Sequence, residues 1–246
     1  SIKMKKLFLL PLALYSFLMF GQNVVVVEYR HVESEHIAEF EAKEIDYWSK
    51  VKQNGIDEGY MLASAFFRLI DAGRVEDETM PTHAFVHVYK DFEQLVNSSK
   101  MWSNTEKILG MKQSLVSTDD ISTTMRIQRY KLIDEILPLR EFKYAVWNYA
   151  KPKDFNGFVN ENLKLWKPYF QKKVGKNGLA GYGILARVHP QGMEQSSVLT
   201  YDHYTDLASA MQALSPMDYD QSIISKSKMS EYDPDGFRYM VLLELI

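Results

Sequence analysis

The sequence predicts an α+β fold in which two similar units follow one another, each with the element order β-α-β-β-α-β. The first observation is a pair of helical stretches, 37–51 and 155–169, whose apolar residues have the same spacing along one helical face. Each stretch contains a tryptophan at the matching position, Trp48 and Trp166. The second observation is that strand-type and helical segments follow both stretches in the same order. We therefore expect a duplicated chain.

The first unit is predicted to span residues 22–131. It opens with four consecutive valines, a β-branched run typical of a strand in a covered sheet. Ser34 is expected to cap the first helix, Gly55 to end it, and Asp91 to cap the second helix. Strands are expected at 24–32, 60–70, 82–89 and 123–130, and helices at 37–51 and 92–109.

A connector at 132–141 leads to the second unit at 142–246. Its predicted order again matches the split βαβ, or ferredoxin-like, unit, so the expected fold is two ferredoxin-like units in tandem. Strands are expected at 142–149, 182–188, 197–204 and 237–246, and helices at 155–170 and 206–214. Matching residues in the two units include Tyr29 with Tyr149, Arg68 with Arg187, and Arg126 with Arg238.

The first residues are typical of a secretory signal peptide. A basic start is followed by an apolar run at 7–20 and then by Gly21 and Gln22, which predicts cleavage after Gly21. The run is shorter than the roughly twenty residues that a membrane-spanning helix needs. We therefore expect a bacterial protein that is periplasmic or secreted, with 1–21 as its signal peptide and no stable membrane span after cleavage.

Composition narrows the classes of partner and chemistry. The chain has 29 basic and 32 acidic residues and no block of basic residues, which argues against nucleic acid as a partner. It has no cysteine, so it has neither a thiol nucleophile nor a disulfide. It also lacks the Gly-rich phosphate loop, the G-x-S-x-G elbow and the H-E-x-x-H zinc motif. A small-molecule ligand is the expected partner, and a homo-oligomer stays open.

In its predicted element order and duplication, the chain resembles the dimeric α/β-barrel superfamily. That group includes antibiotic-biosynthesis-type monooxygenases, haem-degrading monooxygenases, chlorite dismutase-like proteins and NIPSNAP-like proteins. The resemblance implies that two sheets pack face to face with helices outside, and that here the barrel closes within one chain. It implies a pocket and leaves the activity undetermined.

One face of the strand predicted at 82–89 is the main candidate for a site. Its aliphatic residues are expected to face the helices, because a sheet covered by helices presents its apolar face to them. The residues that alternate with them would then point into the barrel and line a cavity. The other interpretation is a partly exposed face with solvated histidines. The residues expected to line the cavity are His83, Phe85, His87 and Tyr89, with Thr200, Asp202 and Tyr204 at the matching positions of the second unit.

Two charged strand residues complete the predicted site. A buried Glu28 could act as a base, although a salt bridge with Arg126 on the neighbouring strand is the more ordinary role. Arg126 could alternatively clamp an anionic ligand. We favour the salt bridge, because a ligand would otherwise have to supply the missing countercharge.

The histidines do not form a metal motif. His83 and His87 are four residues apart on a strand, which places them about 13 Å from each other, too far to share one metal ion. No metal is therefore predicted. Haem stays open as a cofactor, because one histidine suffices as its proximal ligand. Four histidines are candidates, and nothing in the sequence singles out one of them: His83, His87, His189 and His203.

Three functions follow from these observations. The first is an exported protein that binds a small apolar or aromatic molecule in the barrel. The second is an oxygenase or a haem-dependent enzyme that uses a histidine of the lining. The third is a non-catalytic assembly module. The sequence does not decide between them.

Overall fold

The structure is a computed structural model that describes residues 23–70, 80–215 and 220–246. The predicted signal peptide at 1–21 lies outside these residues. Within the described part of the chain, no helix combines the length and apolar character needed to cross a membrane.

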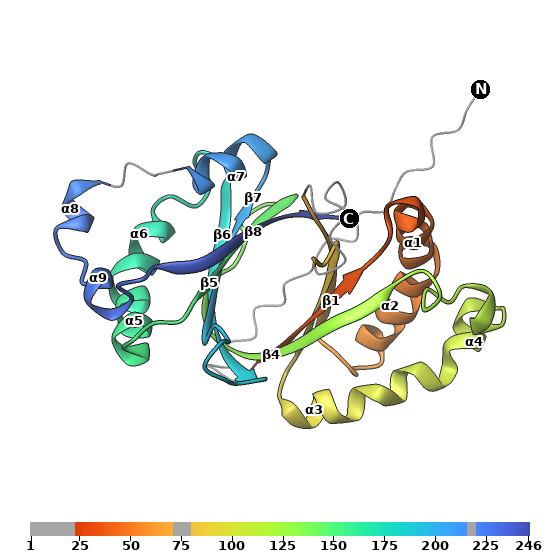
Figure 1. The fold of residues 1–246 in the computed structure, drawn as a ribbon. Coiled ribbons are helices and arrows are strands. Elements are labelled where there is room, and N and C mark those ends of the chain that lie inside the picture. Colours follow the sequence, from red (N-terminus) through yellow and green to blue (C-terminus); the bar gives the residue numbers. More distant parts are fainter. Residues whose placement is uncertain (1–22, 71–79, 216–219) are drawn as a thin grey trace.

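Eight antiparallel strands close into a barrel, so the fold is mixed α and β as predicted (Figure 1). Around the barrel the order is β1-β3-β2-β8-β5-β7-β6-β4, and the two halves of the chain meet where β2 pairs with β8 and β4 pairs with β6. The strands are β1 (Val24–His31), β2 (Ala63–Leu69), β3 (His83–Tyr89), β4 (Thr123–Ile136), β5 (Tyr144–Ala150), β6 (Leu179–His189), β7 (Val198–Tyr204) and β8 (Phe237–Leu245).

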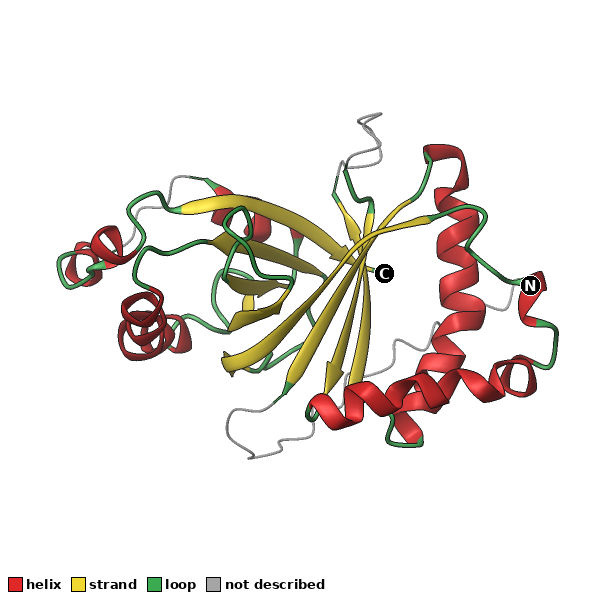
Figure 2. Cartoon of the chain, turned by 60° about the horizontal axis from the view of Figure 1, so that its bottom comes forward, coloured by secondary structure: helices red, strands yellow, loops and turns green. Residues whose placement is uncertain are grey.

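The helices lie outside the barrel, with those of the first half on one side and those of the second half on the other (Figure 2). Both helices that the apolar spacing predicted are present, and each contains a five-residue π-helical turn, Glu44–Trp48 in one and Asn162–Trp166 in the other. The helices are α1 (Ile37–Lys43), α2 (Ser49–Asp57), α3 (Phe92–Asn97), α4 (Thr105–Leu109), α5 (Phe155–Glu161), α6 (Lys167–Gln171), α7 (Leu207–Leu214), α8 (Gln221–Ile224) and α9 (Met229–Tyr232).

Two predicted helix caps and one predicted strand end can be compared with the structure. The carboxylate of Asp91 accepts a hydrogen bond from the Gln94 backbone N–H, as expected of a cap. Ser34 is not a cap, because a short 3₁₀ turn precedes α1 and no side chain bonds its first N–H groups. The residues 132–136, predicted as connector, continue β4, because the strand must reach far enough to pair with β6.

The barrel interior is a packed core of aliphatic and aromatic side chains from all eight strands. Large rings from β1, β2, β4 and β5, among them Tyr29, Phe67 and Trp147, fill its centre. Separate apolar clusters lie between the sheet and the helices of each half. Most strand positions are therefore covered by the opposite wall of the barrel on one face and by helices on the other, whereas Phe237, Tyr239 and Met240 of β8 are exposed.

Candidate functional site

The predicted inward face of β3 faces the helices instead. The side chains of Ala84, Val86 and Val88 pack into the barrel core. Phe85 packs with α1 and Tyr89 with α2, so the prediction that they line the barrel is wrong. The physical reason is space, because the aromatic rings inside the barrel leave room only for small side chains on β3.

His83 and His87 share this helix-facing side of β3. The ring of His83 contacts Phe40 of α1, with 5.0 Å between ring centroids. The ring of His87 is parallel to Phe85, 6.2 Å away. The predicted inward orientation of both histidines is therefore wrong as well.

The same inversion holds in the second half. Leu199 and Tyr201 of β7 pack into the barrel, so the residues that alternate with them, Thr200, Asp202 and Tyr204, face the helices. The predicted site residues do share one face, as the strand alternation required. That face lies under the helices rather than inside the barrel.

A buried polar layer lies under the helix formed by α5, the π-helical turn and α6. The amide Nδ2 of Asn148 donates to Asp202 Oδ2 at 3.1 Å and to Thr200 Oγ1 at 3.3 Å. The hydroxyl of Tyr182 donates to Oδ1 of Asn162, the first residue of the π-helical turn, at 2.6 Å. Because Tyr182 pairs with Asp202 across β6 and β7, these groups belong to one layer, which we call the Asp202 layer.

Asp202 is the most perturbed acid of this layer. Its side chain is 9% exposed, and within the described structure Oδ1 has no hydrogen-bond partner. Burial raises the pKa of Asp202 to about 7, against the opposing effect of the Asn148 hydrogen bond. An acid in this state exchanges its proton near neutral pH, which suits general acid-base chemistry.

The matching layer in the first half centres on His87. His87 pairs with Val26 as Asp202 pairs with Val146, so the two residues occupy equivalent positions in the sheet. Its Nδ1 lies 3.1 Å from the Ser64 hydroxyl. Burial and the nearby charge of Lys52 lower the pKa of His87 to about 3, so this ring is neutral at physiological pH.

A third cluster joins α1 to the end of β3. Nε of Arg68 donates to Glu41 Oε1 at 2.6 Å, and His83 Nε2 lies 3.0 Å from the same oxygen. The other ring nitrogen of His83 lies 2.8 Å from the hydroxyl of Thr82. Burial raises the pKa of Glu41, but hydrogen bonds from His83 and Arg68 outweigh it and bring that pKa to about 2. Both ring nitrogens of His83 are thus engaged, which leaves none to bind a cofactor.

Glu28 and Arg126 do not form the predicted salt bridge. Glu28 Oε1 instead pairs with Arg30 Nε at 2.7 Å and accepts a hydrogen bond from Thr124 at 3.0 Å. The guanidinium of Arg126 lies over the ring of Tyr29, 4.3 Å from its centroid. Glu28 faces outward and Arg126 inward, since adjacent positions in a sheet point to opposite faces.

A polar group that no sequence pattern predicted lies inside one end of the barrel. The hydroxyls of Tyr29 and Tyr149 hydrogen-bond each other across the interior. Beside them, the side-chain amide of Gln128 lies 2.7 Å from the Tyr130 hydroxyl, and the guanidinium of Arg187 donates to that hydroxyl at 3.1 Å. The one available signal was the match between Tyr29 and Tyr149.

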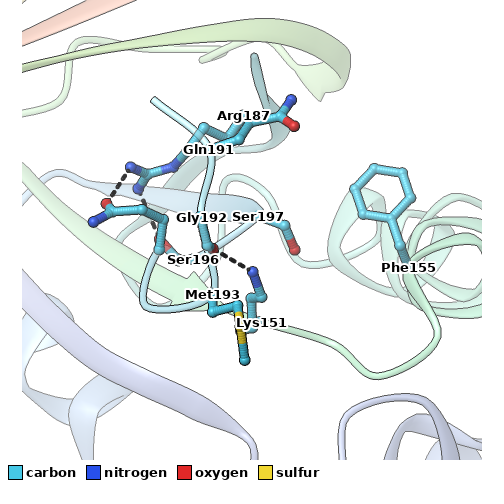
Figure 3. Close-up of a pocket in the computed structure, with 9 residues that line it drawn as sticks. Lys151, Phe155, Arg187, Gln191, Gly192, Met193, Ser196 and Ser197 are labelled. Carbon is cyan, nitrogen blue, oxygen red and sulfur yellow. Dashed lines mark hydrogen bonds between the residues drawn. The ribbon is translucent and has the colours of Figure 1, made fainter. Parts of the chain in front are cut away.

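Two pockets are formed by described residues of the second half of the chain. The larger has a volume of about 540 Å³ and the smaller about 300 Å³. The larger, shown in Figure 3, is lined by Lys151, Phe155, Arg187, Gln191, Gly192, Met193, Gln195, Ser196 and Ser197. The smaller is lined by Gly157, Asn160, Glu161, Lys164, Leu165, Lys226, Lys228 and Tyr232.

Neither pocket fits haem. No histidine lines either of them, and the histidines under the helices lie in packed surroundings. Among the described residues, no three His, Asp or Glu side chains are grouped so that they could hold a metal ion.

Comparisons with known proteins identify the fold. No family model matches the sequence, and no curated protein is similar to it in sequence. Its structure is similar to an anthrone oxidase-like protein, with 14% identity, a TM-score of 0.55 and 92% of each chain covered. A candidate monooxygenase from Lactobacillus acidophilus NCFM has 7% identity and a TM-score of 0.53, covering 92% of this chain and 93% of that one. Chlorite dismutase from Candidatus Nitrospira defluvii has 10% identity and a TM-score of 0.51, with 92% of each chain covered. The feature shared with these proteins is the fold, an α/β barrel.

Proposed function

We propose that the chain is an oxygenase-type enzyme that acts on a small organic molecule at the Asp202 layer. The observation that carries the proposal is Asp202 itself, a buried carboxyl whose Oδ1 has no partner in the described structure and whose pKa is about 7. Leaving a buried polar atom unpaired costs stability, so such an atom is more common at functional sites than in ordinary cores. The structural neighbours named as an oxidase-like protein and a monooxygenase support the same class.

In the proposed reaction Asp202 acts as a general base. It removes a proton from an acidic C–H that is conjugated with a ketone through aromatic rings, and the resulting carbanion transfers electrons to molecular oxygen. For an anthrone, the CH₂ group becomes a carbonyl, one oxygen atom enters the product and the other leaves as water. Asn148 holds the Asp202 carboxyl in place through its hydrogen bond to Oδ2.

Substrate access requires the helix above Asp202 to move. The π-helical turn Asn162–Trp166 lies in that helix, where it interrupts the regular hydrogen bonding between α5 and α6. Turns of this kind occur frequently at functional sites. A matching turn, Glu44–Trp48, lies above the His87 layer, but a neutral histidine with a pKa of about 3 is a poor base for this reaction.

The test uses anthrone and air-saturated buffer, with oxygen uptake and product absorbance as readouts. Asp202→Asn keeps the shape of the side chain and its bond to Asn148 but removes the base. We expect turnover to fall by about 10²-fold or more, the usual size of a general-base contribution. The control is Asp120→Asn, the same change at an exposed acid. Full activity in the Asp202 variant would refute the proposal.

A second candidate is binding of a small molecule without turnover. It is favoured by the larger pocket, whose volume of about 540 Å³ lies in the usual range for ligand sites. Ligand binding without oxygen uptake, unchanged in Asp202→Asn, would support this function over the enzyme.

We further propose that the chain is a tandem duplication exported by its signal peptide, with units at 22–131 and 142–246. Support for the duplication comes from the two π-helical turns, each with a buried polar residue first and a tryptophan last. The export proposal rests on the sequence alone. N-terminal sequencing of the protein recovered from a bacterial periplasm or medium should begin at Gln22, and an uncleaved cytoplasmic product would contradict it.

A further inference from the structure

Arg187, near the end of β6, is a buried cation whose hydrogen-bond partners among the described residues are neutral groups. Its side chain is 7% exposed. Nη1 donates to Gln195 Oε1 at 3.0 Å, and Nη2 donates to the Ser196 hydroxyl at 2.8 Å and to the Tyr130 hydroxyl at 3.1 Å. Nε has no partner among the described residues.

This arrangement lacks a countercharge. No carboxylate of the described structure forms a salt bridge with Arg187, although thirteen other side-chain ion pairs are present, among them Arg68 with Glu41. Burying a charge away from water is costly unless an opposite charge offsets it. An anion bound beside Arg187 would supply the missing partner.

The larger pocket adjoins this cation. One part of the pocket wall is formed by Arg187, Ser196 and Ser197. Lys151 contributes a second cation, and its Nζ donates to Gly192 O at 2.8 Å. Phe155, at the start of α5, faces the pocket across from these groups (Figure 3). The pocket therefore combines two positive charges with an aromatic wall.

We propose that this pocket binds an organic carboxylate with an aromatic body. The carboxylate takes the place of the Gln195 amide on the Arg187 guanidinium, so that a charged acceptor replaces a neutral one. Charge-assisted hydrogen bonds between a guanidinium and a carboxylate are stronger than those to a neutral amide. Lys151 adds a second attraction to the same anion, and the aromatic body packs against Phe155. The inference does not depend on the Asp202 layer, because no residue of that layer lines this pocket.

The probe is benzoate, titrated into the whole chain by isothermal titration calorimetry. Benzamide is the matched neutral probe, because it has the same size and ring but no charge. Lys151→Met removes the more accessible cation, and Arg187→Gln removes the buried one. Lys172→Met is the control, since Lys172 is exposed and lies outside the pocket. Circular dichroism establishes whether each variant is folded.

We expect benzoate to bind the wild type and the Lys172 variant equally. In Lys151→Met and Arg187→Gln its Kd should rise by about tenfold or more, and benzamide should bind the wild type at least about tenfold more weakly than benzoate. If Arg187→Gln does not fold, the Lys151 variant decides. The proposal is overturned if benzoate gives no binding, if Lys151→Met binds it unchanged, or if benzamide binds as well. It is also overturned if inorganic sulfate competes as effectively as benzoate, because the aromatic wall would then play no part.

Discussion

Replacing Asp202 by asparagine tests the buried acid through the stability of the fold, independently of any substrate. The variant keeps a side chain of the same shape and a hydrogen-bond acceptor for Asn148, whose amide donates to Asp202 at 3.1 Å. It removes only the ability to ionise. The comparison therefore isolates the effect of titrating this one carboxyl.

The size of the effect follows from the raised pKa. Below pH 3.8 the carboxyl is protonated in both the folded and the unfolded state, and it contributes no pH dependence. Between pH 3.8 and about 7 the folded state keeps a proton that the unfolded state has released, so the free energy of unfolding falls as the pH rises. Above that range the carboxyl is ionised in both states and the loss is complete. At about 1.4 kcal/mol per pKa unit, the wild type loses roughly 4 kcal/mol relative to the variant.

The assay is urea unfolding of both proteins at about pH 4 and about pH 8, followed by circular dichroism. At the lower pH we expect the free energy of unfolding of the wild type to be at least equal to that of Asp202→Asn. At the higher pH we expect the wild type to have lost roughly 4 kcal/mol of this free energy relative to the variant. Asp120→Asn should show no such change relative to the wild type. A difference between wild type and Asp202→Asn that is the same at both pH values would refute the raised pKa, and with it the role of Asp202 as a base near neutral pH.

Four further substitutions test a buried hydrogen bond, the core packing and an ionised carboxylate. Tyr29→Phe and Tyr149→Phe should each lower the free energy of unfolding by about 1–2 kcal/mol, and the double variant by less than the sum, because both remove one buried hydrogen bond; urea unfolding checks this. Gly183→Ala should destabilise the fold by about 1–3 kcal/mol in thermal unfolding, since overpacking a core has this cost. Its added Cβ would lie 2.1 Å from the ring of Tyr201, and an equally stable variant would show that the ring can move aside. Glu41→Gln should flatten the acid dependence of stability: a carboxylate whose pKa is lowered to about 2 stabilises the fold above pH 4.5, and that contribution is lost as the pH falls toward 2.

The order of strands and helices could be predicted from the sequence because each element carries its own local signal. The apolar spacing around Trp48 and Trp166 marked both long helices, and the valine run marked β1. The π-helical turns were not predicted, because apolar spacing alone does not distinguish them from regular helix.

The predicted site residues were grouped correctly but placed on the wrong side of the sheet. Strand alternation puts His83, Phe85 and His87 on one face whatever the fold, because successive side chains point in opposite directions. The polarity of a strand shows which face turns inward only where one face is buried and the other is exposed to solvent. In this barrel both are buried, so the polarity of β3 gives no reliable guide.

The candidate sites depend on contacts between distant parts of the chain. Asp202 was predicted as a site residue, but its pairing with Asn148 requires the register of β5 against β7. Asn162 approaches this layer only through the packing of its helix on the sheet. Arg187 meets Tyr130 where β4 pairs with β6, a seam between the two halves that no local pattern could reveal.

Local periods and the chemistry of neighbouring residues were enough to predict most of the elements, their order and the sets of side chains that share a face. Packing between distant segments sets which face the helices cover and, among the described residues, which acid keeps an unpaired oxygen and which cation has no countercharge. Those properties depend on burial and on hydrogen bonds between strands far apart in the chain. They set the pKa of Asp202 and the neutral surroundings of Arg187, and so they define the two sites proposed for this protein.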